Sequence, residues 1–94
     1  MKATLIKKEN LTYYNFPLED VLPKMHDKVE RKRELQKAMV LGNGFKHKVK
    51  IDFFTKGRPY PVSVETTVWS VDDDFVFLKG GRTIPVKSIK SIQL

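Results

Sequence analysis

Hydrophobic and polar residues alternate most regularly in the second half of the chain. Val49, Ile51 and Phe53 share one side of a predicted strand within residues 45–55, and charged residues occupy the other side. The same spacing continues through residues 62–71, where the apolar residues change sides near Thr66. A strand that presents apolar residues to two sides in succession is strongly bent. We therefore expect a bent strand with Trp69 anchored in the core.

Tight turns divide the rest of this half into short strands. Asp72, Asp73 and Asp74 disfavour a strand and mark one turn. The apolar run 75–78 ends at the Gly80-Gly81 pair, and a similar run begins at residue 83. Ile89 and Ile92 are three residues apart, which suits a single tight turn that leads into a last strand. Short strands joined in this way predict a small antiparallel barrel of about five strands.

A helical region is predicted before these strands, over residues 17–41. Asp20 has the side chain of a helix N-cap, and Pro23 in the first turn loses no hydrogen bond that the helix needs. Gly42-Asn43-Gly44 favours the left-handed conformation in which helices end. We therefore expect the helix to begin near Asp20 and to end before Gly42.

The predicted helix has two apolar stripes. The first contains Leu22, Met25 and Val29, and the second, rotated by about a quarter turn, contains Leu35, Ala38 and Met39. The helix therefore packs on a curved surface or has a separate partner for each half. Its charges are self-neutralising, which is typical of a solvated face. The predicted ion pairs are Asp20–Lys24, Asp27–Arg31, Glu30–Arg33 and Glu34–Lys37.

Together these elements predict an α+β, mainly β protein of one domain, residues 1–94. Residues 1–44 form an N-terminal segment and helix, and residues 45–94 form the small barrel. The chain has no cysteine, which excludes disulfides and thiolate metal sites. Its longest apolar run, residues 38–41, is much shorter than the ~20 residues that cross a bilayer. We expect a soluble, cytoplasmic protein that has no membrane partner.

The charge balance is basic. The 94 residues contain 18 Lys and Arg against 11 Asp and Glu, which gives a net charge of +7, and both halves of the chain share the excess. Lysine and arginine side chains bind nucleic acid by displacing condensed counterions, so the balance permits a nucleic-acid partner. A net charge far from zero also keeps proteins apart in solution, and this alternative stays open.

The basic residues that could follow a phosphate backbone lie mainly on one strand and one loop. Alternate residues of the 45–55 strand are lysines, which could also serve to prevent sheet-to-sheet aggregation. The loop of residues 56–61 adds two cations and an aromatic ring to a scaffold, although it could equally be a plain hairpin connection. The full set of candidate nucleic-acid-binding residues is Lys46, Lys48, Lys50, Lys56, Arg58, Tyr60, Lys79 and Arg82.

Catalytic chemistry has little support in the sequence. His26 and His47 lie on different predicted elements, and no glycine-rich phosphate loop or nucleophile motif is present. The three adjacent aspartates lack the spaced ligands of a calcium loop. We expect a binding module that is not an enzyme and that uses no cofactor and no metal.

The segment Val76-Phe77-Leu78-Lys79-Gly80 resembles the second motif of Sm-like proteins, in which a hydrophobic strand ends in a cation and a glycine. The continuation over residues 84–92 is similar to the strand, one-turn helix and strand that end SH3-like barrels. The resemblance implies an SH3-like or Sm-like small barrel, with Lys79 and Gly80 beside an RNA base. The chain also resembles short uncharacterised bacterial proteins that share its V-E-T-T-V-W and L-K-G-G-x-T-I-P patterns.

These observations favour two functions. The first is a module that binds RNA or single-stranded DNA through the basic strand and loop, with Tyr60 stacking on a base. The second is a protein-interaction module that binds another protein or a second copy of itself, through Leu35, Ala38 and Met39 and an open edge of the barrel. The two differ in salt dependence, because counterion release affects only the first strongly.

Overall fold

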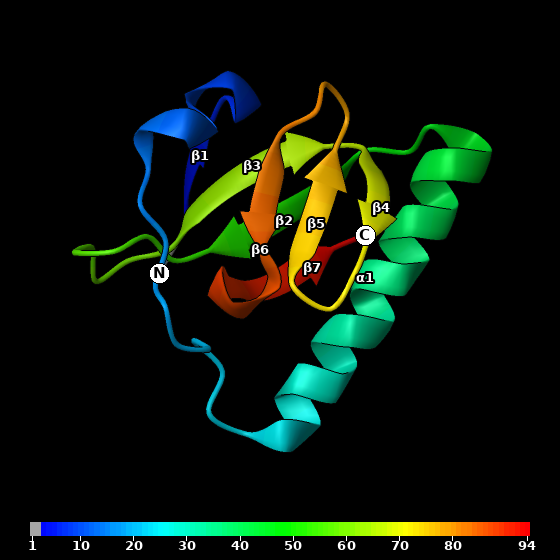
Figure 1. Ribbon diagram of the computed structural model, residues 1–94. Coiled ribbons are helices and arrows are strands. Elements are labelled where there is room, and N and C mark those ends of the chain that lie inside the picture. The colour runs from blue at the N-terminus through cyan, green and yellow to red at the C-terminus, as the bar shows by residue number, and fades with distance from the viewer. Residues whose placement is uncertain (1–2) are drawn as a thin grey trace.

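The computed structural model describes residues 3–94 and combines one long helix with two small sheets of mostly antiparallel strands (Figure 1). This is an α+β architecture, as predicted, but residues 3–94 contain seven strands and about as many helical as strand residues, so the predicted mainly β content and five strands are wrong. The chain begins with a short strand and a 3₁₀ helix, β1 (Thr4–Ile6) and η1 (Lys8–Tyr13), before the long helix α1 (Met25–Phe45). The remaining elements follow in the order β2 (Val49–Phe53), β3 (Val62–Thr66), β4 (Val68–Val71), β5 (Phe75–Leu78), β6 (Thr83–Pro85), η2 (Val86–Ser88) and β7 (Ile89–Gln93).

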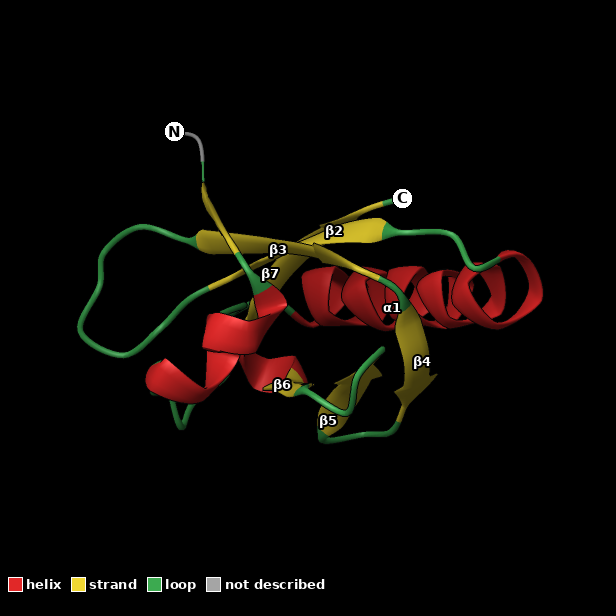
Figure 2. Cartoon of the chain, turned by 90° about the horizontal axis from the view of Figure 1, so that it is seen from above, coloured by secondary structure: helices red, strands yellow, loops and turns green. Residues whose placement is uncertain are grey.

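The two sheets are joined through a nearly continuous strand. One sheet has the order β1-β3-β2-β7, with β1 parallel to β3 and the other pairs antiparallel, and the second has the order β4-β5-β6. Only Thr67 separates β3 from β4, and its carbonyl accepts a hydrogen bond from the Lys79 N–H at 2.9 Å. The bend expected within residues 62–71 is therefore confirmed. Figure 2 shows the four-stranded sheet above β5 and β6, with α1 along one side.

The core lies between the two sheets and α1. The alternation predicted for residues 45–55 is confirmed, since Val49, Ile51 and Phe53 are all buried. The β2–β3 register pairs Ile51 with Val64, so the two strands present their apolar side chains to the same side of the sheet. The other buried hydrophobic residues are Leu11, Leu35, Ala38, Val62, Val68, Val76, Leu78, Ile84, Ile89 and Ile92.

The predicted boundaries of the helix are wrong at both ends. It begins at Met25 and not near Asp20, and it continues through Gly42 and Gly44 as far as Phe45. Its C-cap is Lys46, in the left-handed conformation with φ 53°, and the His47 N–H donates to the Leu41 carbonyl at 3.2 Å. Tertiary contact explains the extension, because the Gly42 backbone packs directly against the Val68 carbonyl in β4.

The predicted apolar stripes are also redistributed. Met25 and Val29 of the first stripe are exposed, whereas Leu35 and Ala38 of the second are in the core. The surface proposed for protein interaction is therefore largely buried. The helix contacts β4 and β7, and its buried residues are Arg31, Leu35, Ala38 and Gly42, so the first predicted stripe does not face the sheets.

Trp69 does not anchor the core; it is 48% exposed. The pairing of β4 with β5 shifts register between Val68 and Ser70, which is the signature of a β-bulge. The bulge leaves both Trp69 and Ser70 exposed, because the alternation of inward and outward side chains is interrupted there. The turns at Asp72–Asp74 and at Gly80-Gly81 are confirmed. A short helix does precede the last strand, but it is Val86–Ser88; the tight turn predicted from Ile89 and Ile92 is wrong, because both residues lie in β7.

A buried ion pair fixes α1 to the segment that precedes it. Arg31 is predicted to pair with Asp27, but its guanidinium donates to both carboxylate oxygens of Asp20, at 2.8 and 2.6 Å. It also donates to the Ile89 carbonyl at 3.0 Å, which links the helix to β7. Of the predicted pairs, Glu30–Arg33 is present at 3.0 Å. No helix within residues 3–94 combines the length and the apolar character needed to cross a membrane.

Candidate functional site

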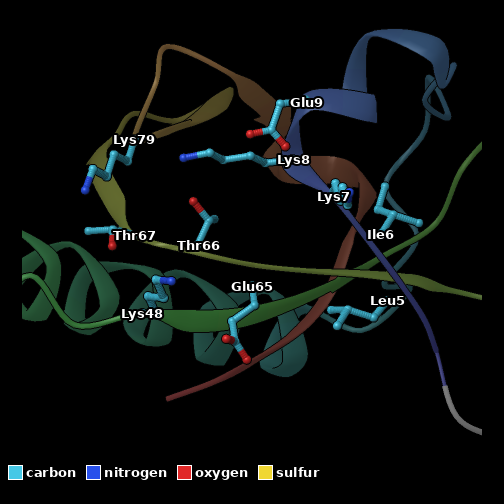
Figure 3. Close-up of a pocket in the computed structure, with 10 residues that line it drawn as sticks. All are labelled: Leu5, Ile6, Lys7, Lys8, Glu9, Lys48, Glu65, Thr66, Thr67 and Lys79. Atoms are coloured by element: carbon cyan, nitrogen blue, oxygen red, sulfur yellow. The ribbon is translucent and has the colours of Figure 1, made fainter.

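A cavity of about 330 Å³ opens at one end of the four-stranded sheet, between η1 and the turn that joins β5 to β6 (Figure 3). Four of its lining residues are lysines from three separate parts of the chain, so we call it the lysine cavity. Its lining consists of Leu5, Ile6, Lys7, Lys8, Glu9, Lys48, Glu65, Thr66, Thr67 and Lys79.

Strand pairing brings these lysines together. The parallel register of β1 and β3 places Ile6 opposite Val64, so Lys7 and Lys8 follow directly beside the end of β3. The antiparallel register of β2 and β3 pairs Val49 with Thr66, so Lys48 lies at the same end of the sheet. Lysines that are distant in sequence are thus brought to one opening.

The diglycine turn supplies the opposite wall. Gly80 and Gly81 have φ of 92° and 88°, a left-handed conformation that other residues rarely adopt, and the Gly81 N–H closes the turn on the Leu78 carbonyl at 3.0 Å. A Cβ built on Gly80 would lie 3.6 Å from Nζ of Lys8. Lys8 therefore reaches from η1 across to the turn that presents Lys79.

The cavity has an excess of positive charge. Within residues 3–94, none of the four lysines forms an ion pair, since the salt bridges present are those of Arg31, Lys32 and Arg33. Glu9 and Glu65 also line the cavity, but in Figure 3 the Glu65 carboxylate points away from the lysines, whereas Glu9 lies beside Lys8. Because neither glutamate forms an ion pair with a lysine of the cavity, the ammonium groups are free to bind an anion.

Thr66 is a buried polar residue on the wall of the cavity. It is 2% exposed, and its Oγ1 is buried with no hydrogen-bond partner within residues 3–94. A buried polar atom without a partner costs roughly 1–3 kcal/mol, and such atoms are uncommon in folded proteins. Figure 3 shows the hydroxyl directed toward the side chain of Lys8. The cavity therefore contains a hydrogen-bonding group that the protein itself does not use.

The structure divides the predicted nucleic-acid-binding residues among several places. Lys48 and Lys79 line the lysine cavity. Lys50 lies on the outer side of β2 opposite Glu65, and Lys46 is the C-cap of α1. Arg82 lies in the diglycine turn, where its carbonyl accepts the Leu78 N–H at 2.7 Å.

The predicted loop residues form a separate site at the opposite end of β2. Lys56 is exposed, and Arg58 and Tyr60 line a second cavity of about 320 Å³ together with Thr4, Pro59 and Pro61. The Arg58 guanidinium lies 5.7 Å from the centre of the Tyr14 ring, so part of its charge is engaged within the protein. The loop is visible at the far left of Figure 1, away from the diglycine turn.

The sequence did not indicate Lys7, Lys8, Thr66 or Thr67 as part of a site. Lys7 and Lys8 lie in a segment with no clear pattern, and no local signal predicts that β1 joins the sheet in parallel. Thr66 could have been noticed in the sequence, because it places a hydroxyl group among alternate positions that are otherwise valine: Val62, Val64 and Val68. A polar residue at such a position needs either a partner or a ligand.

Within residues 3–94, no three His, Asp or Glu side chains gather in a way that could hold a metal ion. Comparison with family models, with curated proteins and with solved structures finds no match to this chain. The site is therefore defined by its own geometry: a small, partly open cavity with four lysines and one unpartnered hydroxyl.

Proposed function

We propose that this protein is a non-enzymatic module that binds RNA or single-stranded DNA, and that the lysine cavity is the centre of its binding surface. The observation that supports this most directly is the convergence of Lys7, Lys8, Lys48 and Lys79 on one opening without ion-pair partners. Nucleic-acid backbones offer closely spaced negative charges, which such a group of cations matches. The predicted residues Lys48 and Lys79 belong to this centre.

We also propose that the two sheets are the halves of one SH3-like barrel. In support, β3 and β4 form a bent strand interrupted only by Thr67, and η2 precedes the last strand as the resemblance implied. Buried residues of both sheets, such as Ile51 and Val76, belong to one core cluster. In this arrangement the diglycine turn and the start of β2 lie at the same rim of the barrel.

The alternative function, a protein-interaction or self-assembly module, has weaker support. Two of the three residues proposed for its surface, Leu35 and Ala38, are buried in the core. Light scattering tests it, since a monomer at all concentrations would argue against self-assembly.

The nucleic-acid proposal is tested by titrating a labelled single-stranded oligonucleotide of about 10 nucleotides at several salt concentrations. Four phosphate contacts predict a slope of log K against log salt of about −3, which corresponds to roughly a 50-fold loss of affinity between about 50 and 200 mM salt. The double variant Lys48→Gln/Lys79→Gln should weaken binding and reduce the slope by about 1.4.

A matched control has the same change of net charge at exposed lysines outside the cavity, Lys37→Gln/Lys90→Gln. It should leave the slope close to that of the unmodified protein. Equal effects of the two double variants would mean that net charge, and not the cavity, attracts the oligonucleotide. Absence of binding at low salt would overturn the proposal.

A further inference from the structure

We infer that the lysine cavity is a phosphate site, in which the Thr66 hydroxyl donates a hydrogen bond to a phosphate oxygen and Lys8, Lys48 and Lys79 balance its charge. The inference rests on the proposed function and specifies which group of the nucleic acid enters the cavity: the phosphate, and not the base.

The balance of donors and acceptors supports a phosphate. Ammonium groups only donate hydrogen bonds, and the Thr66 hydroxyl has a proton for which residues 3–94 provide no acceptor. Figure 3 shows the hydroxyl directed toward Lys8, whose ammonium group cannot accept the proton. A ligand group that only accepts hydrogen bonds and is negatively charged satisfies every one of these donors, and a phosphate group has both properties.

The position of Thr66 explains why its hydroxyl is suited to this task. The residue is the last of β3 and is paired with Val49, so its backbone is held by β2. Threonine is β-branched and Thr66 is buried, so its side chain has few rotamers to lose when it binds, which favours a preorganised contact. Lysine carries its charge on a flexible four-carbon stem, so the lysines around Thr66 can adjust to the phosphate oxygens that its hydroxyl does not contact.

The size of the cavity suits one nucleotide unit. Its volume of about 330 Å³ is at the lower end of the ~300–1,000 Å³ typical of small-ligand sites. Because the cavity is partly open, a chain of further nucleotides can extend from it over the surface. A single phosphate with its sugar is therefore the unit that we expect to be bound.

The experiment compares two variants that remove one buried, unpartnered hydroxyl each. Thr66→Val keeps the shape of the side chain and removes the proposed donor. Thr55→Val makes the same change at a residue that is 4% exposed, has an equally unpartnered Oγ1 and does not line the cavity. Neither change removes a hydrogen bond present in the protein, so both variants should fold with unchanged or higher stability.

Binding of uridine monophosphate, uridine, inorganic phosphate and acetate is followed by the amide and methyl NMR shifts of Thr66 and its neighbours at constant ionic strength. We expect uridine monophosphate and inorganic phosphate to shift these signals and uridine to leave them unchanged. Acetate should shift them less than phosphate does, because a carboxylate has one charge and two oxygens, whereas a phosphate monoester has nearly two charges and three oxygens. Thr66→Val should weaken uridine monophosphate binding about tenfold, and Thr55→Val should not change it.

Failure of this inference and failure of the proposed function give different results. Salt-dependent oligonucleotide binding that Thr66→Val leaves unchanged, with no response to phosphate, would overturn the phosphate site while the nucleic-acid function stands. Phosphate binding at Thr66 without oligonucleotide binding would support the site and overturn the nucleic-acid function. Equal shifts with uridine or acetate would also overturn the phosphate assignment.

Discussion

Arg31 is a buried cation whose partners all come from other parts of the chain. It is 5% exposed, and it binds the Asp20 carboxylate and the Ile89 carbonyl. Removing one member of a buried pair leaves the other without compensation, which costs ~3–5 kcal/mol. We predict that Asp20→Asn lowers the free energy of unfolding by about 3 kcal/mol, measured by urea unfolding at neutral pH. The exposed pair Glu30–Arg33 is the control, and Glu30→Gln should cost under ~0.5 kcal/mol.

The same pair makes stability depend on pH. The hydrogen bond from Arg31 holds the pKa of Asp20 below its usual value of 3.8, against a smaller effect of burial that raises it. A carboxylate with a lowered pKa in the folded state stabilises the protein fully above its unfolded pKa, and this contribution disappears as the pH falls through the folded pKa. The difference between the unmodified protein and Asp20→Asn should therefore shrink below about pH 4. A difference that stays constant down to low pH would contradict the ion pair.

At the scale of elements, the end of α1 is held by its contact with β4. A Cβ on Gly42 would collide with the Val68 carbonyl, whereas one on Gly44 would have no atom within 4 Å. We predict that Gly44→Ala stabilises the protein by about 0.5–1 kcal/mol, because alanine favours a helix over glycine. Gly42→Ala should instead destabilise it by about 1–3 kcal/mol through overpacking. Thermal unfolding of the two variants measures both effects, and equal shifts of the two midpoints would contradict the close approach.

This contact also explains why α1 could be predicted as an element but not bounded from the sequence. Gly42-Asn43-Gly44 has the local preference of a helix end, yet Gly42 allows the helix to approach β4 and the Asn43 side chain donates to the Trp69 carbonyl at 3.1 Å. Neither contact is visible in the local pattern, because both join residues about 26 positions apart. Tertiary contact overrides local propensity here.

The strands show the same division. β2 was predictable because every second residue faces the core, so apolar and charged residues alternate over five consecutive positions. The exposure of Trp69 was not predictable, because it depends on a register shift against β5. The candidate site was predicted only in part, because some of its residues belong to local patterns and others are brought there by long-range pairing. Lys79 has a recognisable local motif, whereas Lys8 reaches the site only through the parallel pairing of β1 with β3.

At the scale of the whole molecule, the two candidate groups of basic residues lie at opposite ends of β2. Lys48 and Lys79 belong to the lysine cavity, and Lys56 and Arg58 lie in the loop beyond the opposite end of β2. A five-residue strand is about 17 Å long, which exceeds the ~8 Å Debye length at physiological salt. The two places should therefore act independently on any ligand small enough to occupy one of them.

We predict that Lys56→Gln/Arg58→Gln leaves the affinity for uridine monophosphate unchanged, whereas Lys48→Gln/Lys79→Gln reduces it about tenfold or more, with the same loss of two charges in each variant. Calorimetric titration at physiological salt measures both. If a longer oligonucleotide contacts both places, the loop variant should weaken only that ligand, because a short ligand cannot span β2. A loop variant that weakens uridine monophosphate as much as the cavity variant does would mean that the general field of the protein, and not the arrangement around Thr66, determines binding.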